Sequence, residues 1–159
     1  MDVKTVEILE ETLSNTLETM AFMFADRVEK GALEYSLEQL VCAEIEFSGK
    51  ANGTLRIIAP FSTCCILSAN MLGMEVEDDE CSDKAYDAFK EALNVICGQF
   101  LTTAYGELEV FRLSTPRIAE CTDIMVRESL DDEGSVGFLV EEKVFIVQLL
   151  YNISAGEAK

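Results

Sequence analysis

Four residues in the second half of the chain recur at helical spacing and could act together. They are Asp87, Glu91, Asn94 and Gly98, which are separated by four, three and four positions. At about 3.6 residues per turn, this spacing places all four on one face of a helix. A carboxylate pairs with cations and accepts hydrogen bonds, whereas the Asn94 carboxamide donates and accepts at once. Such a face could bind a polar partner.

Two of these four residues are unfavourable inside a helix. Asparagine competes for backbone hydrogen bonds, and glycine costs about 1 kcal/mol relative to alanine. Both lie away from the apolar stripe, because Phe89 is about 200° from Glu91 at about 100° per residue. Unfavourable residues on an exposed face indicate a surface that contacts another molecule. The alternative is an ordinary solvated face on which Asn94 and Gly98 are incidental.

No histidine occurs among the 159 residues, and its absence excludes several kinds of active site. The chain cannot contain a Ser-His-Asp triad, a Cys-His pair or a histidine metal ligand. None of its 6 cysteines forms a C-x-x-C spacing, so we expect buried hydrophobic residues rather than a metal or redox site. An unrelated metal- or thiol-dependent enzyme is therefore disfavoured.

The charge balance is strongly acidic, with 30 acidic against 12 basic residues and a formal net charge of -18. Such a surface repels phosphate backbones and anionic lipids, so we expect neither nucleic-acid nor membrane binding. It would favour a partner with a cationic face, although acidic surfaces also simply keep proteins soluble. With no long apolar run and no secretory pattern at residues 1–4, we expect a soluble, cytoplasmic protein.

Hydrophobic periodicity predicts two long helices and one short one. Apolar residues every three or four positions indicate amphipathic helices over residues 3–29 and 83–105. Between them, residues 61–72 predict a short, largely buried helix that ends at Gly73.

Strands fill most of the remaining chain. Residues 41–47 and 54–59 have strand character, and Asn52-Gly53 between them is a strong hairpin signal. Further strand-like segments are residues 109–113, 118–121, 124–127, 137–140 and 144–151. The expected class is α+β, with the helices packed on an antiparallel sheet.

The two long helices resemble each other weakly. A shift of eighty positions aligns apolar with apolar and polar with polar residues, and it brings Glu11 onto Glu91 and Ser14 onto Asn94. Any two amphipathic helices align in this way, but each is also followed by paired strands. A duplicated α-β-β unit is therefore plausible.

A pattern of Asp87-x-x-x-Glu91-x-x-Asn94, followed twenty-two residues later by Pro116, resembles the signature of the CheC/CheX/FliY chemotaxis phosphatases. It reads D-A-F-K-E-A-L-N-V-I-C-G-Q-F-L, and then L-S-T-P-R-I-A-E-C. The resemblance covers nearly the whole chain and is greatest to CheX, which has one intact motif per subunit. We therefore expect residues 1–159 to form a single CheX-like domain with a CheC-like fold.

This resemblance implies a phosphatase that hydrolyses the aspartyl phosphate of a CheY-like response regulator. Asn94 and Glu91 would be the catalytic residues, Asn94 orienting the attacking water and Glu91 docking to the partner's active-site lysine. Asp87, Glu91 and Gly98 would contact the partner. A non-catalytic module with the same fold, which binds a regulator or flagellar switch component, remains the alternative.

The resemblance also implies the accessory groups. No metal or cofactor would be bound by this chain, and Mg²⁺ would belong to the partner regulator. The family forms homodimers through its sheet, so a homodimer is implied. The equivalent positions of the first helix, Glu11 and Ser14, would be inactive because a serine lacks the amide's paired donor and acceptor.

Overall fold

The computed structural model describes residues 1–36 and 40–152. Its helices are α1 (Val3–Ala21), α2 (Phe61–Leu72), α3 (Asp79–Asp83), α4 (Ala85–Tyr105) and α5 (Asp123–Asp131), with a 3₁₀ turn η1 (Lys30–Ala32). Its strands are β1 (Ala25–Val28), β2 (Leu40–Ser48), β3 (Gly53–Pro60), β4 (Arg112–Leu113), β5 (Arg117–Ala119), β6 (Ser135–Val140) and β7 (Lys143–Tyr151). The predicted α+β class is confirmed.

All seven described strands belong to one antiparallel sheet. Their order is β1-β6-β7-β3-β2-β4, and β5 also pairs with β2. The hairpins β2–β3 and β6–β7 meet at the sheet centre, where Ile57 pairs with Val147. Each half of the chain contributes one strand that pairs with the other half. Strand β1 of the first half pairs with β6, and strand β5 of the second half pairs with β2. In each half the exchanged strand lies between the long helix and the hairpin, so it is additional to the expected α-β-β unit.

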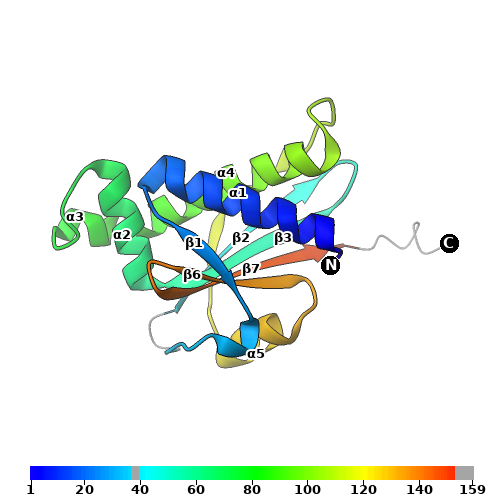
Figure 1. Cartoon of the computed structure of the whole chain (residues 1–159). Helices are drawn as coiled ribbons and strands as arrows, with labels where there is room; N and C mark the ends of the chain where they lie inside the picture. Colours follow the sequence, from blue (N-terminus) through cyan, green and yellow to red (C-terminus); the bar gives the residue numbers. More distant parts are fainter. Residues whose placement is uncertain (37–39, 153–159) are drawn as a thin grey trace.

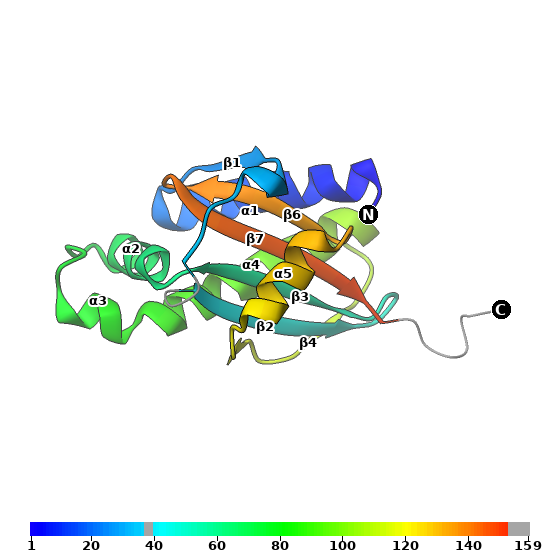
Figure 2. The ribbon, with the colours of Figure 1, turned by 90° about the horizontal axis from the view of Figure 1, so that it is seen from below.

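The helices cover both faces of this sheet. The long helices α1 and α4 lie side by side on one face, whereas α5 crosses the opposite face (Figures 1 and 2). The larger apolar core lies under α1, α2 and α4, and its fully buried side chains include Phe89, Phe100, Leu13 and Leu93. A second, smaller core lies under α5, where Val126 is fully buried.

The first helix is shorter than predicted. It ends at Ala21, and residues 25–28 form strand β1 instead of continuing the helix to residue 29. Phe22 adopts a left-handed conformation with φ of 53°, and the amide N–H groups of Phe22 and Met23 bond back to Glu18 and Leu17. This is an αL helix end, at which glycine is the usual residue. Because phenylalanine occupies the position, no stop signal was visible in the sequence.

The predicted strand over residues 124–127 is wrong, because this segment lies in helix α5. Thr122 caps the helix, since its side-chain oxygen accepts a hydrogen bond from the Met125 amide at 3.2 Å. The consecutive Ile124, Met125 and Val126 have strand-like character, but burying Val126 against the sheet stabilises the helix. The helix predicted over 83–105 is α4, which begins at Ala85, and the short helix α3 that precedes it was not predicted.

The cysteines lie where the sequence predicted. Five are buried and Cys121 is half-buried, and all six are free thiols. Burial raises the pKa of the Cys42 and Cys97 thiols to about 12. Neither thiol is therefore suited to act as a nucleophile near neutral pH.

Candidate functional site

Helix α4 holds its polar face outward because its opposite face is anchored in the main core. Phe89, Leu93 and Ile96 are at most 1% exposed under this helix. Glu91 is exposed, and Asn94 lies half-buried one turn further along the same outer face. The buried face therefore fixes the rotation of α4 about its axis and, with it, the direction of the polar stripe.

The loop between β4 and β5, at the edge of the sheet, lies beside this stripe. Residues 113–116 line a surface depression of about 470 Å³ together with the polar face of α4. The lining residues are Asp87, Lys90, Glu91, Asn94, Leu113, Ser114, Thr115 and Pro116. The structure thus brings Pro116 to the same hollow as Asp87, Glu91 and Asn94, whereas Gly98 lies one turn beyond it.

Pairing to the edge of the sheet holds this loop in place. Strand β2 pairs with β4 before the loop and with β5 after it. In the gap, the Ser114 amide donates to the Glu46 carbonyl at 2.9 Å, and the Glu46 amide donates to Ser114 Oγ at 2.9 Å. Pro116 lies where the ladder is interrupted, so its missing N–H leaves no pairing partner unsatisfied.

An ion pair to a buried carboxylate anchors the end of the loop. Arg117, directly after Pro116, donates from Nη2 to Glu44 Oε2 at 2.7 Å. The other Glu44 oxygen accepts from Arg56 Nε at 2.7 Å, and the whole Glu44 residue is only 5% exposed. Desolvation acts to raise the pKa of Glu44, but the hydrogen bonds from Arg56 and Arg117 hold that pKa below its ordinary value. Glu44 is therefore an ionised carboxylate that links β2, β3 and β5.

The carboxylates of the stripe differ in their partners. Asp87 Oδ1 lies 3.4 Å from Lys90 Nζ, although its side chain is 79% exposed. Among the residues that the structure describes, no cation lies within ion-pair distance of Glu91. Glu91 is therefore the carboxylate best placed to meet an external cation, and Asp87 is already partly compensated.

The Asn94 amide is also available. Within residues 1–36 and 40–152, its side chain makes no hydrogen bond to another protein group. A carboxamide in this state can accept from one group and donate to another at the same time.

Gly98 leaves an open surface one turn further on. A Cβ atom added to it would meet nothing within 4 Å, so packing inside this chain does not require glycine here. The neighbouring helix turn is regular, with Thr102 Oγ1 donating to the Gly98 carbonyl at 2.9 Å. The glycine therefore leaves room on the outer face of α4 and not in the core.

Sequence reasoning missed four residues that line the depression, namely Lys90, Leu113, Ser114 and Thr115. Lys90 was detectable in principle, because it stands three positions after Asp87, a spacing at which opposite charges pair on a helix. Ser114 and Thr115 had no such signal, since their place depends on pairing with β2. Within the described residues, no group of three or more acidic or cysteine side chains is arranged to hold a metal ion.

Comparison with protein families identifies the chain. The family described as chemotaxis phosphatase CheX matches residues 41–139, well over half of the sequence and all of the residues around the depression. The chain belongs to the CheX family. A comparison with curated protein sequences gave no match.

Solved structures of CheX proteins share this fold over nearly their full length. CheX from Desulfovibrio desulfuricans aligns with a TM-score of 0.66 at 16% identity, over 94% of this chain and 100% of that one. A putative chemotaxis protein from Desulfovibrio vulgaris Hildenborough gives 0.67 at 21% identity, over 94% and 97%. CheX in a CheX–CheY–BeF3–Mg complex from Borrelia burgdorferi gives 0.65 at 16% identity, over 96% and 100%. At these identities the likeness establishes the fold.

CheX-family membership supports a chemotaxis phosphatase or CheY-binding role for the chain. The matched region begins with β2 and ends in β6, so it contains α4 and the 113–116 loop but not α1. In the part of the chain that the structure describes, no helix is both long enough and apolar enough to cross a membrane.

Proposed function

We propose that this chain hydrolyses the aspartyl phosphate of a CheY-like response regulator. Family membership supports this activity, and so does the CheX–CheY–BeF3–Mg complex solved for the Borrelia relative. The observation that carries the proposal is the depression in which the unpartnered Glu91 and Asn94 side chains lie beside Pro116. Both residues face outward, toward a partner and not toward the core.

The proposed chemistry needs positioning more than a strong base. Water attacks phosphorus, a new P–O bond forms, and the bond between phosphorus and the aspartyl oxygen breaks. The products are inorganic phosphate and a free aspartate carboxylate, with the water's proton passing to phosphate or solvent. Asn94 would accept a hydrogen bond from the attacking water and donate one to a phosphoryl oxygen. Alignment of this kind supplies much of the catalysis in phosphoryl transfer.

Glu91 would dock the partner. It lies three residues before Asn94 on the same face, so a partner lysine bound to its carboxylate sets where the amide reaches. Asp87 shares its charge with Lys90 and would contribute to docking only. Gly98 would allow the partner's backbone to approach α4 closely. The Mg²⁺ that the reaction needs would be held by the regulator.

The overall charge suits this partner. A net charge of -18 favours encounter with the cationic part of a regulator's surface, most strongly at low ionic strength. A homodimer and a cytoplasmic location, both implied by the family resemblance, are further parts of the proposal. Light scattering of the purified chain tests the dimer directly.

The second candidate is a module that binds the regulator without hydrolysing it. It shares the fold and the docking residues, and it differs only in whether Asn94 reaches the phosphoryl group. The availability of the amide in the same depression as Glu91 favours hydrolysis.

The test is the decay of phosphorylated CheY-like receivers, measured with and without this chain. The wild type should accelerate decay, and Asn94→Ala should abolish most of the acceleration. Asn15→Ala is the matched control, because it makes the same substitution at an exposed asparagine inside the other long helix. Glu91→Gln should mainly raise KM, since it removes docking and leaves the amide in place. If the chain binds phosphorylated receivers but accelerates none of them, the binding module is the correct account.

A further inference from the structure

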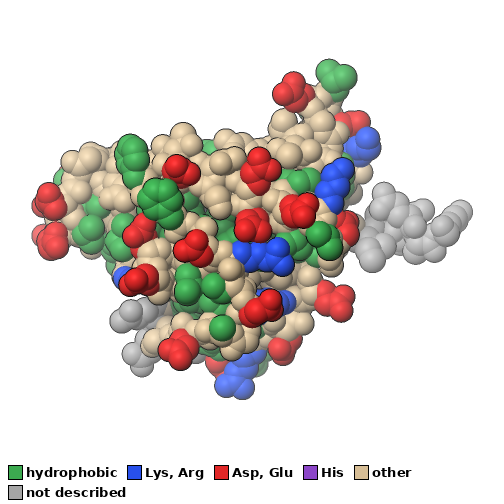
Figure 3. Space-filling model, viewed as in Figure 1, with side chains coloured by type: hydrophobic (Ala, Val, Ile, Leu, Met, Phe, Trp, Pro, Cys, Tyr) green, Lys and Arg blue, Asp and Glu red, His purple; other side chains and the backbone are tan. Residues whose placement is uncertain are grey.

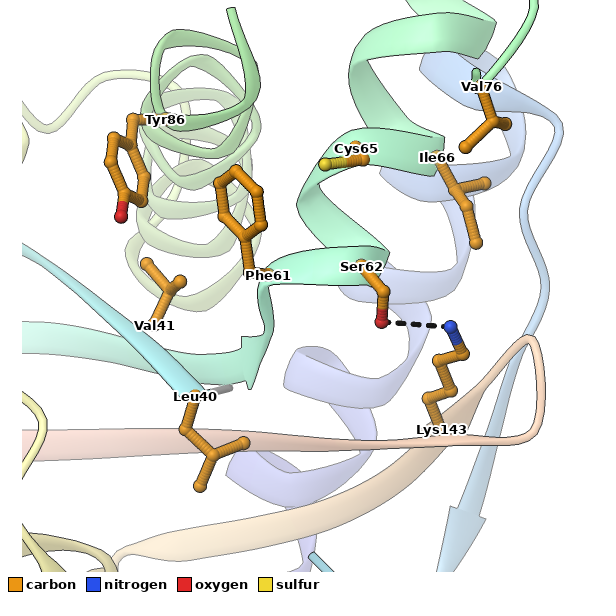
Figure 4. A pocket seen from close by; sticks show the side chains of 9 residues that line it. All are labelled: Leu40, Val41, Phe61, Ser62, Cys65, Ile66, Val76, Tyr86 and Lys143. Atoms are coloured by element: carbon orange, nitrogen blue, oxygen red, sulfur yellow. Dashed lines mark hydrogen bonds between the residues drawn. The ribbon is translucent and has the colours of Figure 1, made fainter. Parts of the chain in front are cut away.

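A second hollow lies away from the polar face of α4, between α2 and the start of β7. Its volume is about 640 Å³, larger than the depression beside Asn94 and within the range of small-molecule sites. Figure 4 shows the side chains that line it, which come from β2, α2, α4, the first residue of β7 and the segment between α2 and α3. They are Leu40, Val41, Phe61, Ser62, Cys65, Ile66, Val76, Tyr86 and Lys143.

Most of this hollow is apolar. Aliphatic side chains from three different segments form part of its wall, among them Val41, Ile66 and Val76. Phe61 and Tyr86 add an aromatic side, with ring centroids 5.5 Å apart and tilted by 59°. Val76 and Tyr86 are 41% and 47% exposed, so the apolar wall opens to solvent. A ligand with an apolar body could cover this surface.

One end of the hollow is cationic. Lys143 Nζ donates to Ser62 Oγ at 2.8 Å, and the dashed line in Figure 4 marks this bond. The Ser62 hydroxyl accepts from the lysine, so its own proton is free to be donated. Ser62 also lies in the first turn of α2, which begins after Pro60 without a side-chain cap. An ammonium, a hydroxyl and the positive end of a helix dipole therefore converge.

The ammonium group of Lys143 forms no ion pair within the described part of the chain. No carboxylate of residues 1–36 or 40–152 lies within ion-pair distance of it, although Glu141 and Glu142 directly precede it. Glu75 and Glu77 flank Val76 and make the surroundings acidic. At physiological ionic strength such charges are screened over about 8 Å, so groups in direct contact decide the preference.

We propose that this hollow binds a small organic anion with an apolar body, of the class of aromatic carboxylates and sulfonates. The anionic group would accept hydrogen bonds from Lys143 and Ser62, and the rings would pack against Phe61 and Tyr86. This site is separate from Glu91 and Asn94 and does not depend on the phosphatase activity.

The test compares two fluorescent probes with the same rings, anilinonaphthalene sulfonate and its uncharged parent phenylnaphthylamine, at 0.15 M salt. The sulfonate should bind at one site and more tightly than the neutral probe. Lys143→Gln should weaken sulfonate binding about tenfold and change neutral-probe binding less than about twofold. Lys50→Gln is the matched control, since it removes the same charge from a lysine that pairs with Glu109.

Two further variants complete the test. Val76→Asn should weaken both probes because it interrupts the apolar wall. Asn94→Ala should bind the sulfonate like the wild type, which separates this site from the proposed phosphatase site. Equal sulfonate affinity in Lys143→Gln and the wild type, with unchanged urea midpoints, would overturn the proposal. Tighter binding of the neutral probe than of the sulfonate would overturn it as well.

Discussion

The ion pairs of Glu44, which anchor the loop at Pro116, should contribute measurably to the free energy of unfolding. In the variant Glu44→Gln, the amide keeps the shape of the side chain but removes the charge between Arg56 and Arg117. Both guanidinium groups lie within 2.7 Å of the carboxylate. Breaking a buried pair usually costs about 3–5 kcal/mol. Arg56 keeps its hydrogen bond to Gln148 at 2.8 Å, so we expect about 3 kcal/mol, at the lower end.

The two arginines should contribute unequally. The Arg56 side chain is 18% exposed and holds one Glu44 oxygen with two nitrogens, so Arg56→Met should cost about as much as Glu44→Gln. The Arg117 side chain is 66% exposed, so water can replace it, and Arg117→Met should cost about 1 kcal/mol or less. Urea unfolding followed by far-UV circular dichroism at pH 7.5 measures all three free energies. Equal losses for the two arginine variants would refute this account of the site.

The same network should respond to pH with a definite sign. The folded-state pKa of Glu44 lies below its ordinary value of 4.5, because the two arginine hydrogen bonds outweigh desolvation. Its stabilisation is therefore fully present above that value and is lost as the pH falls through the folded-state pKa. The difference in unfolding free energy between wild type and Glu44→Gln should shrink as the pH is lowered below 4.5. A difference that stays constant between pH 7.5 and the acid range would contradict the assignment.

Three other experiments test the site and its surroundings. Gly98→Ala should increase the free energy of unfolding by up to about 1 kcal/mol, which a higher urea midpoint would report. The same variant should slow dephosphorylation of the receiver. Unchanged activity would mean that no partner backbone approaches α4 at this position. The buried Cys42 and Cys97 thiols should resist a thiol reagent at pH 8 until urea unfolds the chain, and rapid labelling of either in the native protein would contradict their burial. Ser14→Asn, made in the Asn94→Ala background, should not restore receiver dephosphorylation, and recovery of activity would show that the amide suffices without the loop.

Local sequence signals were sufficient wherever a single element determines the structure. The polar stripe of α4 was predicted because its apolar residues repeat at helical spacing over 21 residues. The hairpin was predicted from Asn52-Gly53 and the strand character of its flanks, and β2 and β3 do pair, with residues 49–52 connecting them and Gly53 opposite Phe47. In both cases the decisive neighbours stand within a few positions of each other along the chain.

The sequence was insufficient where pairing with a segment far along the chain determines the local structure. Residues 25–28 become a strand because β6 pairs with them, and β6 begins more than one hundred positions later. The walls of the depression depend in the same way on pairing between β2 and the segments around Ser114 and Arg117. No periodicity within residues 113–116 reports that pairing, so only the spacing of Pro116 from Asn94, known from the family resemblance, pointed to this loop.

The two halves of the fold explain why only one long helix is expected to act. Glu11 and Ser14 on α1 have the same exposure as Glu91 and Asn94 on α4, so their burial alone does not distinguish them. The connections that follow α1 and α4 do distinguish the two pairs of residues. Only residues 22–24 separate α1 from β1, whereas residues 106–116 separate α4 from β5 and contain the loop that lines the depression. In the first half, Arg27 of β1 pairs with Glu10 of α1 at 3.5 Å. An asparagine at position 14 would therefore have neither a Pro116 wall nor the anchored loop beside it.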